Sequence, residues 1–183
     1  MGIELIPAAF VAQELTQKII LATHDLENEW FFYDGAFNSS VNIESSINTW
    51  ANENHVAVYN KEIMFYFEGQ WTRPLDIISA FRTINFSKRH SQLFIRALLK
   101  YLEYLFIHRG CKAFNWTVAI QNESAKRQYD KIVTEYCGRV VGIRHYSQKS
   151  YTGKISDSCL YEVTKEDFFE LKNRGFAKRP QLS

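Results

Sequence analysis

The segment from Ala113 to Tyr136 constrains the fold most, because its hydrophobic period changes within two residues. An apolar run that ends at Ile120 is typical of a buried strand, and a helical pattern begins directly after Asn122. The apolar face of that helix comprises Ala125, Tyr129, Ile132 and Val133. Asn122 suits the N-cap position, which Ser124 could share, because its side-chain oxygen can accept an unpaired N–H of the first turn. A strand that ends at a capped helix offers free backbone donors, a usual place for an anionic ligand.

This segment resembles the Asn-x-x-Ala-x-x-x-Tyr-x-Lys…Gly pattern of the GCN5-related N-acetyltransferases. The matching residues are Asn122, Ala125, Tyr129, Lys131 and Gly138. The resemblance implies that the helix lies beside the thiol end of coenzyme A and that Asn122 and Ala125 belong to the cofactor site. It also implies that Tyr129 protonates the departing thiolate. The alternative interpretation is a capped amphipathic helix whose tyrosine is a core residue.

The remaining elements are predicted in the order that the family has. Alternating patterns predict strands over residues 3–6, 55–59, 63–68, 77–86, 111–120, 139–145 and 158–163, with a loop over 147–153. Helical periodicity predicts helices over residues 8–24, 42–54, 88–108, 122–136 and 165–172. The fold class is therefore α/β (α+β), with helices flanking a mixed, mostly antiparallel central sheet. The resemblance adds that the parallel strands on either side of helix 88–108 splay apart. We expect one domain over residues 1–172 and a basic tail over 173–183.

The turn before helix 88–108 departs from the family pattern. In that family it reads Arg/Gln-x-x-Gly-x-Gly/Ala, because backbone N–H groups must approach the cofactor's pyrophosphate closely. No glycine occurs here between Gly69 and Gly110. The resemblance therefore assigns the pyrophosphate to the helix dipole and to the side chains of Lys88, Arg89, His90 and Ser91. The alternative is a solvated basic helix start on a fold that has lost its cofactor.

The strand over residues 77–86 is the one that would carry the cofactor's pantetheine arm in this family. The resemblance makes Phe81, Thr83 and Ile84 candidate cofactor-binding residues, through their backbone groups. A backbone N–H of this strand would stabilise the oxyanion of the reaction. The cofactor implied is acetyl-CoA or another acyl-CoA.

The chemistry that the resemblance implies needs one acid and one base. Tyr129 has a reference pKa of about 10, so it stays protonated near neutral pH and can donate to a leaving thiolate. Glu68 and Asp76, each at a predicted strand end, are candidates for the base that removes the amine's proton, and His145 is a third. The alternative for each carboxylate is a solvated surface charge.

Composition and motifs argue against several other classes of protein. The net charge of +2 gives no support for a nucleic-acid partner, and no apolar run reaches the roughly 18 residues of a membrane span. The N-terminus lacks the features of a signal peptide, so we expect a cytoplasmic protein. The three cysteines have neither metal-site nor disulfide-framework spacing, and no catalytic-triad or phosphate-loop motif occurs. We therefore expect no metal.

Two functional hypotheses remain. The first is an acyl-CoA-dependent N-acyltransferase that acts on an amine of unknown identity. The second is a catalytically inactive protein of the same fold, kept as a binding or structural component with a protein partner or as a homo-oligomer. Small bacteriophage-encoded acetyltransferase-like proteins resemble this chain in the altered glycine loop, which would place such a component in an assembly. An aromatic content of 15% fits a hydrophobic pocket or a buried interface equally.

Overall fold

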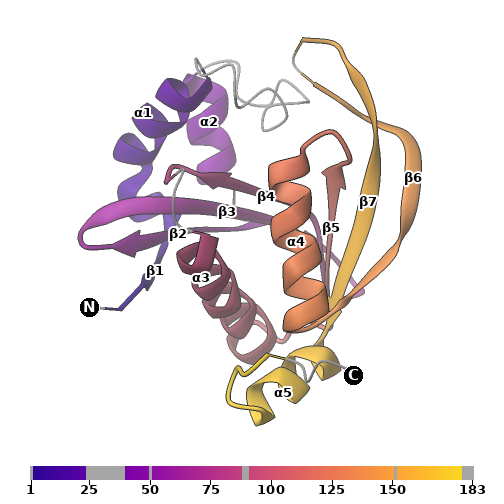
Figure 1. Cartoon of the computed structure of the whole chain (residues 1–183). Helices are drawn as coiled ribbons and strands as arrows, with labels where there is room; N and C mark the ends of the chain where they lie inside the picture. The colour runs from indigo at the N-terminus through magenta and orange to yellow at the C-terminus, as the bar shows by residue number, and fades with distance from the viewer. Residues whose placement is uncertain (1, 24–39, 50, 88–90, 151, 179–183) are drawn as a thin grey trace.

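One seven-stranded sheet forms the centre of the protein (Figure 1). The computed structural model describes residues 2–23, 40–49, 51–87, 91–150 and 152–178. The strands are β1 (Glu4–Pro7), β2 (Asn52–Tyr59), β3 (Glu62–Thr72), β4 (Ile77–Asn85), β5 (Ala113–Ala119), β6 (Arg139–Lys149) and β7 (Ile155–Thr164). Their order in the sheet is β1-β2-β3-β4-β5-β7-β6. Every neighbouring pair is antiparallel except β4 and β5, which are parallel. The expected mixed, mostly antiparallel sheet is confirmed.

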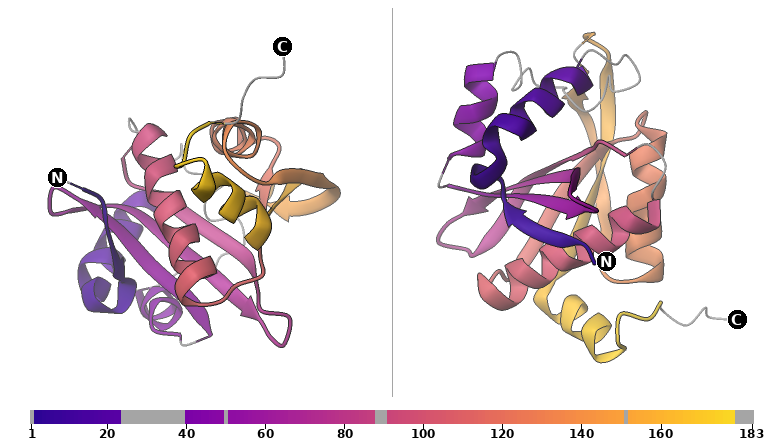
Figure 2. Two further views of the ribbon diagram at one scale, coloured as in Figure 1. Left: turned by 90° about the horizontal axis from the view of Figure 1, so that it is seen from below. Right: turned by 90° about the vertical axis from the view of Figure 1, so that its left-hand side faces the viewer.

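Helices cover both faces of this sheet (Figure 2). They are α1 (Ala12–Thr23) after a 3-10 turn (Ala8–Val11), α2 (Ser40–Ile47), α3 (Ser91–Glu103) with a π-helical end (Tyr104–His108), α4 (Glu123–Glu135) and α5 (Lys165–Asn173). Two buried clusters hold these layers: α1 and α2 pack on one face, and α3, α4 and α5 pack on the other. None of the described helices is long and apolar enough to cross a bilayer.

The second helix is shorter than the sequence predicted. Helical spacing indicated residues 42–54, but α2 ends at Ile47 and β2 begins at Asn52. The side-chain amide of Asn54 donates to the carbonyls of Ser46 and Ile47, at 2.7 and 3.0 Å. These carbonyls end the helix and need such partners, so Asn54 terminates α2 from the neighbouring strand. A contact of this kind is tertiary, and local spacing does not reveal it.

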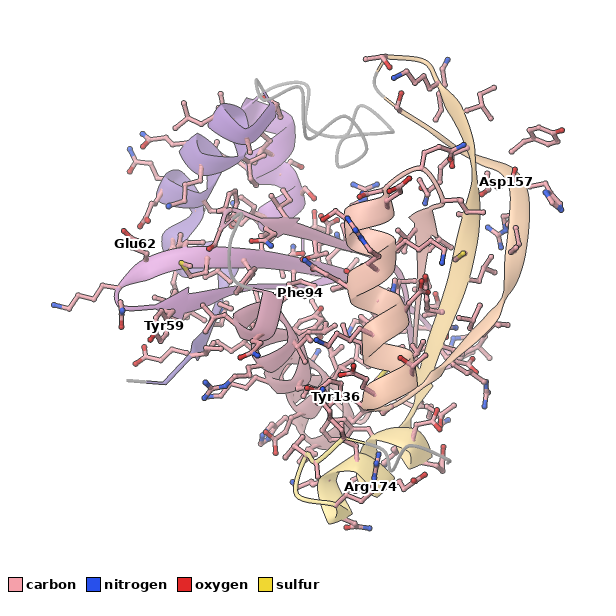
Figure 3. The ribbon with its side chains drawn as sticks, viewed as in Figure 1. Tyr59, Glu62, Phe94, Tyr136, Asp157 and Arg174 are labelled. Carbon is pink, nitrogen blue, oxygen red and sulfur yellow. The ribbon has the colours of Figure 1, made fainter. Side chains whose placement is uncertain are left out.

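The residues that follow the last helix, α5, also pack against the rest of the protein. Thr164 and Asp167 form a capping box at the start of α5. At the other end Arg174 lies beside the end of α4, where its Nη2 donates to the carbonyl of Tyr136 at 2.8 Å (Figure 3). The first residues of the predicted tail therefore pack against the sheet-and-helix body, while residues 179–183 lie outside the described part of the chain.

The parallel pair β4–β5 opens into a V. The two strands pair only at Ile77↔Ala113 and Ile78↔Phe114 and then diverge, which confirms the expected splay. The register between β3 and β4 is irregular beside Gly69, where a bulge bends β4 and gives Ala80 a φ of 48°. Because β5 pairs only with Ile77 and Ile78, the edge of β4 that faces β5 has no strand partner among the described residues over 79–85.

Gly69 is required at this bulge because no side chain fits there. A Cβ at this position would lie 2.6 Å from Cγ2 of Ile78 and 2.9 Å from the hydroxyl of Tyr101. The close approach lets β3, β4 and α3 meet at one point. A larger residue at this position of the bulge would therefore force Ile78 or Tyr101 to move.

Candidate active site

The helix at the open end of the V begins as predicted. Asn122 is the N-cap of α4, and its Oδ1 accepts the backbone N–H of Ala125 at 3.2 Å. The capping oxygen belongs to Asn122 rather than Ser124. Only a short turn separates the end of β5 from α4, so the cap holds the helix N-terminus beside the diverging strands.

A narrow cavity, here called the slot, lies between β4, β5 and α4. Its volume is about 60 Å³, and it is lined by Phe81, Arg82, Thr83, Trp116, Thr117, Val118, Ala119, Asn122, Ala125, Tyr129 and Gln148. A further hollow of about 50 Å³ extends it between α3 and α4 and shares Thr83, Ala125 and Tyr129 with it. The structure therefore brings together five of the predicted residues: Phe81 and Thr83 from β4, and Asn122, Ala125 and Tyr129 from α4 and its N-cap.

Tyr129 lies at the centre of this group and is 3% exposed. Its ring lies 5.3 Å from that of Trp116 and 5.9 Å, edge-on, from that of Phe94 on α3. Within the described chain its hydroxyl has no hydrogen-bond partner. Burial raises the pKa of Tyr129 well above its usual value, so the group remains an O–H donor across the working pH range.

Two further polar atoms at the slot are buried without a partner among the described residues. They are Oγ1 of Thr83 on β4 and Nε1 of Trp116 on β5. An unpaired buried hydroxyl or N–H costs about 1–3 kcal/mol, so native structures rarely retain one without a reason. A ligand with acceptor groups, bound in the slot, would satisfy both atoms.

Both carboxylates predicted as the base lie away from the slot. Glu68 is buried beneath α2 and accepts hydrogen bonds from Asn52, Tyr66 and Ser46. It is a structural carboxylate of the α1–α2 side, because β3 continues past it to Thr72 rather than ending there. Asp76 lies at the closed end of the V, where it forms an ion pair of 3.3 Å with Lys112.

The structure describes only some of the remaining predicted site residues. The side chain of Ile84 packs in the core beneath α1 and α2, so only its backbone is available to the open edge of β4. His145 is exposed on β6, hydrogen-bonded to Asp157 at 2.8 Å, and lines neither the slot nor its extension. Lys88, Arg89 and His90 lie outside the described residues, and of Ser91 the structure describes the backbone alone, as the first residue of α3.

A larger cavity opens from the slot onto the sheet face opposite α4. Its volume is about 440 Å³, and it is lined by Ser79, Ala80, Asn115, Trp116, Thr117, Val141, Arg144, Ser147, Gln148, Ser158, Leu160, Tyr161 and Glu162. Trp116, Thr117 and Gln148 line both cavities, and Nε2 of Gln148 donates to Oγ1 of Thr117 at 3.0 Å. These residues form the junction of the two spaces.

Sequence reasoning did not find the β6 residues of this wall. It predicted a strand over 139–145 followed by a loop, but β6 continues to Lys149. The register shifts between Arg144 and Gln148, so the simple alternation of inward and outward side chains is interrupted there. Only the strand partner, β7, shows which side chains point into the cavity.

Comparison with known proteins gives a match by structure alone. No protein-family model matches the chain, and no curated protein matches it by sequence. Among solved structures, RimJ of Mycobacterium smegmatis in complex with CoA-disulfide superposes with a TM-score of 0.72 at 18% identity, over 98% of this chain and 92% of that one. A GCN5-related N-acetyltransferase from Brucella melitensis gives 0.71 at 14% identity, over 94% and 80%. The chain has the fold of the GCN5-related N-acetyltransferases.

The spermidine N-acetyltransferase SpeG of Vibrio cholerae, in the form of a point mutant, is another similar structure. Its TM-score is 0.68 at 13% identity, over 94% of this chain and 99% of that one. The likeness thus spans almost the whole of each chain, so the V between β4 and β5 belongs to a complete acetyltransferase fold. What this site binds must be argued from its own residues, because identities of this size define the fold alone.

Proposed function

We propose that this protein is an acyl-CoA-dependent N-acyltransferase, in the first place an N-acetyltransferase. The observation that carries the proposal is that one slot holds both the Tyr129 hydroxyl and an edge of β4, neither of which has a hydrogen-bonding partner there among the described residues. Bound acyl-CoA would supply an activated carbonyl and a thiolate leaving group. The protein has to supply binding, alignment and stabilisation of charge.

The open edge of β4 is suited to the pantetheine arm. Its unpaired backbone groups, over residues 79–85, can bond an extended amide-containing chain as they would a neighbouring strand. Phe81, Thr83 and Ile84 would contribute backbone groups, and Thr83 also its free hydroxyl. Oδ1 of Asn122 caps α4, so its amide N–H groups remain to donate to the cofactor. The small side chain of Ala125 leaves the passage open.

The pyrophosphate is assigned to the turn before α3. Lys88, Arg89, His90 and Ser91 precede or begin this helix, whose N-terminus adds a favourable dipole. In this protein cationic side chains would bind the pyrophosphate, in place of the backbone N–H groups that glycines bring close to it in the family. Such binding is more electrostatic and therefore more sensitive to salt.

Tyr129 would act on the leaving group. Its hydroxyl would donate a hydrogen bond to the thioester sulfur, where negative charge would develop when the C–S bond breaks. Because burial raises the pKa of Tyr129, strong hydrogen bonding is favoured over complete loss of its proton. A backbone N–H at the β4 bulge, near Ala80 and Phe81, would stabilise the oxyanion.

The acceptor amine would approach through the larger cavity, which meets the slot at Thr117. Its nitrogen would form the new N–C bond and then give up one proton. Glu68 and Asp76 lie outside both cavities, so neither is placed to take this proton directly. We propose that it leaves through solvent in the open cavity.

The second hypothesis, a non-catalytic binding component, has one structural observation in its favour. The outer strand β6 exposes apolar side chains, with Val140 50%, Ile143 57% and Tyr146 84% exposed. Together with the glycine-free turn, this would suit a fold kept for association. The two hypotheses differ in whether acyl-CoA enters the slot.

A variant whose side chain blocks the slot distinguishes the two hypotheses. Ala125→Leu places a larger side chain in the slot, and Thr134→Leu makes the same kind of change on the exposed far part of the same helix. We expect the first variant to lose binding and thiol release from acetyl-CoA while the second keeps both, with equal helix content by circular dichroism. Unchanged acetyl-CoA binding by Ala125→Leu would remove the slot from the proposal.

A further inference from the structure

We infer that the acceptor is a small amine that also carries a carboxylate, and that Arg144 of β6 holds this carboxylate. The inference rests on the proposed function and deepens it, because it specifies the substrate class of the same site. It concerns the 440 Å³ cavity, from here on called the acceptor cavity.

The two charged side chains of the acceptor cavity differ in whether they already have an ion-pair partner. Arg144 and Glu162 are its two charged lining residues. Glu162 forms an ion pair with Nη2 of Arg139, and its other oxygen lies 3.2 Å from the side-chain nitrogen of Asn115 in the amide orientation that satisfies both groups. Arg144 has no ion-pair partner among the described residues. The described wall therefore presents one uncompensated positive charge to a ligand.

The strand register gives the distance between Arg144 and the junction, where the reacting amine would lie. Thr117, at the junction with the slot, is paired with Leu160 of β7, and Arg144 is paired with Ser158. Because β7 lies between β5 and β6, the backbones of Thr117 and Arg144 are about 10 Å apart across the sheet and about 7 Å apart along it, roughly 12 Å in all. Both residues line the acceptor cavity, so the long side chain of Arg144 covers part of this separation. A molecule whose amine and carboxylate lie a few ångströms apart would cover the rest.

The rest of the lining fits a small molecule of this type. Volumes of roughly 300–1,000 Å³ are usual for small-ligand pockets, and 440 Å³ falls within them. Val141 and Leu160 supply apolar surface, and the hydroxyls of Ser147 and Ser158, which bond each other, add neutral polar groups. A single guanidinium in such a lining matches the single charge of a carboxylate better than the double charge of a phosphate.

The same charges disfavour a polyamine. Spermidine carries several ammonium groups, each of which needs a carboxylate or another acceptor. The one carboxylate of the described wall is already held by Arg139, and Arg144 would repel the ligand. A spermidine acceptor, which the SpeG structures carry in their name, is therefore not expected here.

The test uses matched pairs of amines with the full-length protein and acetyl-CoA. Leucine, phenylalanine and 4-aminobenzoate are each compared with their carboxamides, with spermidine and phosphoethanolamine as further probes, and thiol release is followed. We expect kcat/KM for the acid to exceed that for its amide by about tenfold or more, as the loss of a charged hydrogen bond implies. In Arg144→Gln this ratio should fall towards one. Lys61→Gln, which removes one charge at the distant β2–β3 turn, should leave the ratio unchanged.

The outcomes separate the inference from the proposed function. A preference for the amides, spermidine or phosphoethanolamine, or an acid-to-amide ratio that survives Arg144→Gln, would overturn the inference while leaving an acyltransferase. Calorimetry of the same amines against the protein saturated with coenzyme A covers the case of slow turnover, and no binding of any acid at millimolar concentration would also overturn it. Failure to bind coenzyme A at all would instead overturn the proposed function.

Discussion

Removing one oxygen atom from Tyr129 separates its chemical role from its structural one. Tyr129→Phe keeps the ring contacts with Phe94 and Trp116 and deletes only a hydroxyl that has no partner among the described residues. The free energy of unfolding should therefore stay equal or rise by up to about 1 kcal/mol, since no hydrogen bond is lost. Turnover should fall about 100-fold, which corresponds to about 2.7 kcal/mol of transition-state stabilisation.

The affinity for acetyl-CoA should change by less than about twofold in this variant, because the donor meets negative charge on sulfur only in the transition state. Thiol release measures turnover, calorimetry measures affinity, and urea unfolding measures stability. Tyr101→Phe is the matched control, since its buried hydroxyl donates to the carbonyl of Glu53 at 2.7 Å. It should lose about 1–2 kcal/mol of stability and keep its turnover. Equal turnover in Tyr129→Phe and wild type, or a large loss of affinity, would show that Tyr129 is a packing residue.

Three other changes give defined outcomes. Gly69→Ala should lower the free energy of unfolding by about 1–3 kcal/mol in urea, because its Cβ has no space. Gly142→Ala, whose Cβ would have no atom within 4 Å, should be nearly neutral. Equal losses of stability in the two variants would disprove the close approach at Gly69. Burial lowers the pKa of His55 below 6.5, so stability should be lost as pH falls from about 6.5 towards the lowered value, and His55→Phe should flatten this slope. Replacing Lys88 and Arg89 together with Ala should weaken coenzyme A binding and reduce its salt dependence, and no change in either would exclude the basic turn.

Local features of the site were predictable from the sequence. The cap by Asn122 depends on a spacing of three residues and the position of Tyr129 on a helical spacing, so neighbouring residues determine both. The hairpin turn at Asn60 and Lys61, where both φ angles are positive, is likewise local. The splay of β4 from β5 was expected through the family resemblance alone.

Features that depend on distant contacts were not predictable. Glu68 was expected at a strand end but is buried, because hydrogen bonds from β2 and α2 make its position favourable. The bulge at Ala80 gives a positive φ to a residue that rarely adopts one, and it lies where the register of β4 against β3 shifts beside Gly69. Arg144 lines the acceptor cavity in a strand whose register against β7 shifts twice, and such shifts depend on the strand partner.

Calorimetric titration with coenzyme A and with acetyl-CoA tests the central claim most directly. The account predicts binding of micromolar strength, about 8 kcal/mol, with thermal stabilisation that Ala125→Leu abolishes. Such a result would show that this fold binds the cofactor without the usual glycines. No heat and no thermal stabilisation at millimolar ligand would contradict the account, and the fold would then be one kept for association with a partner.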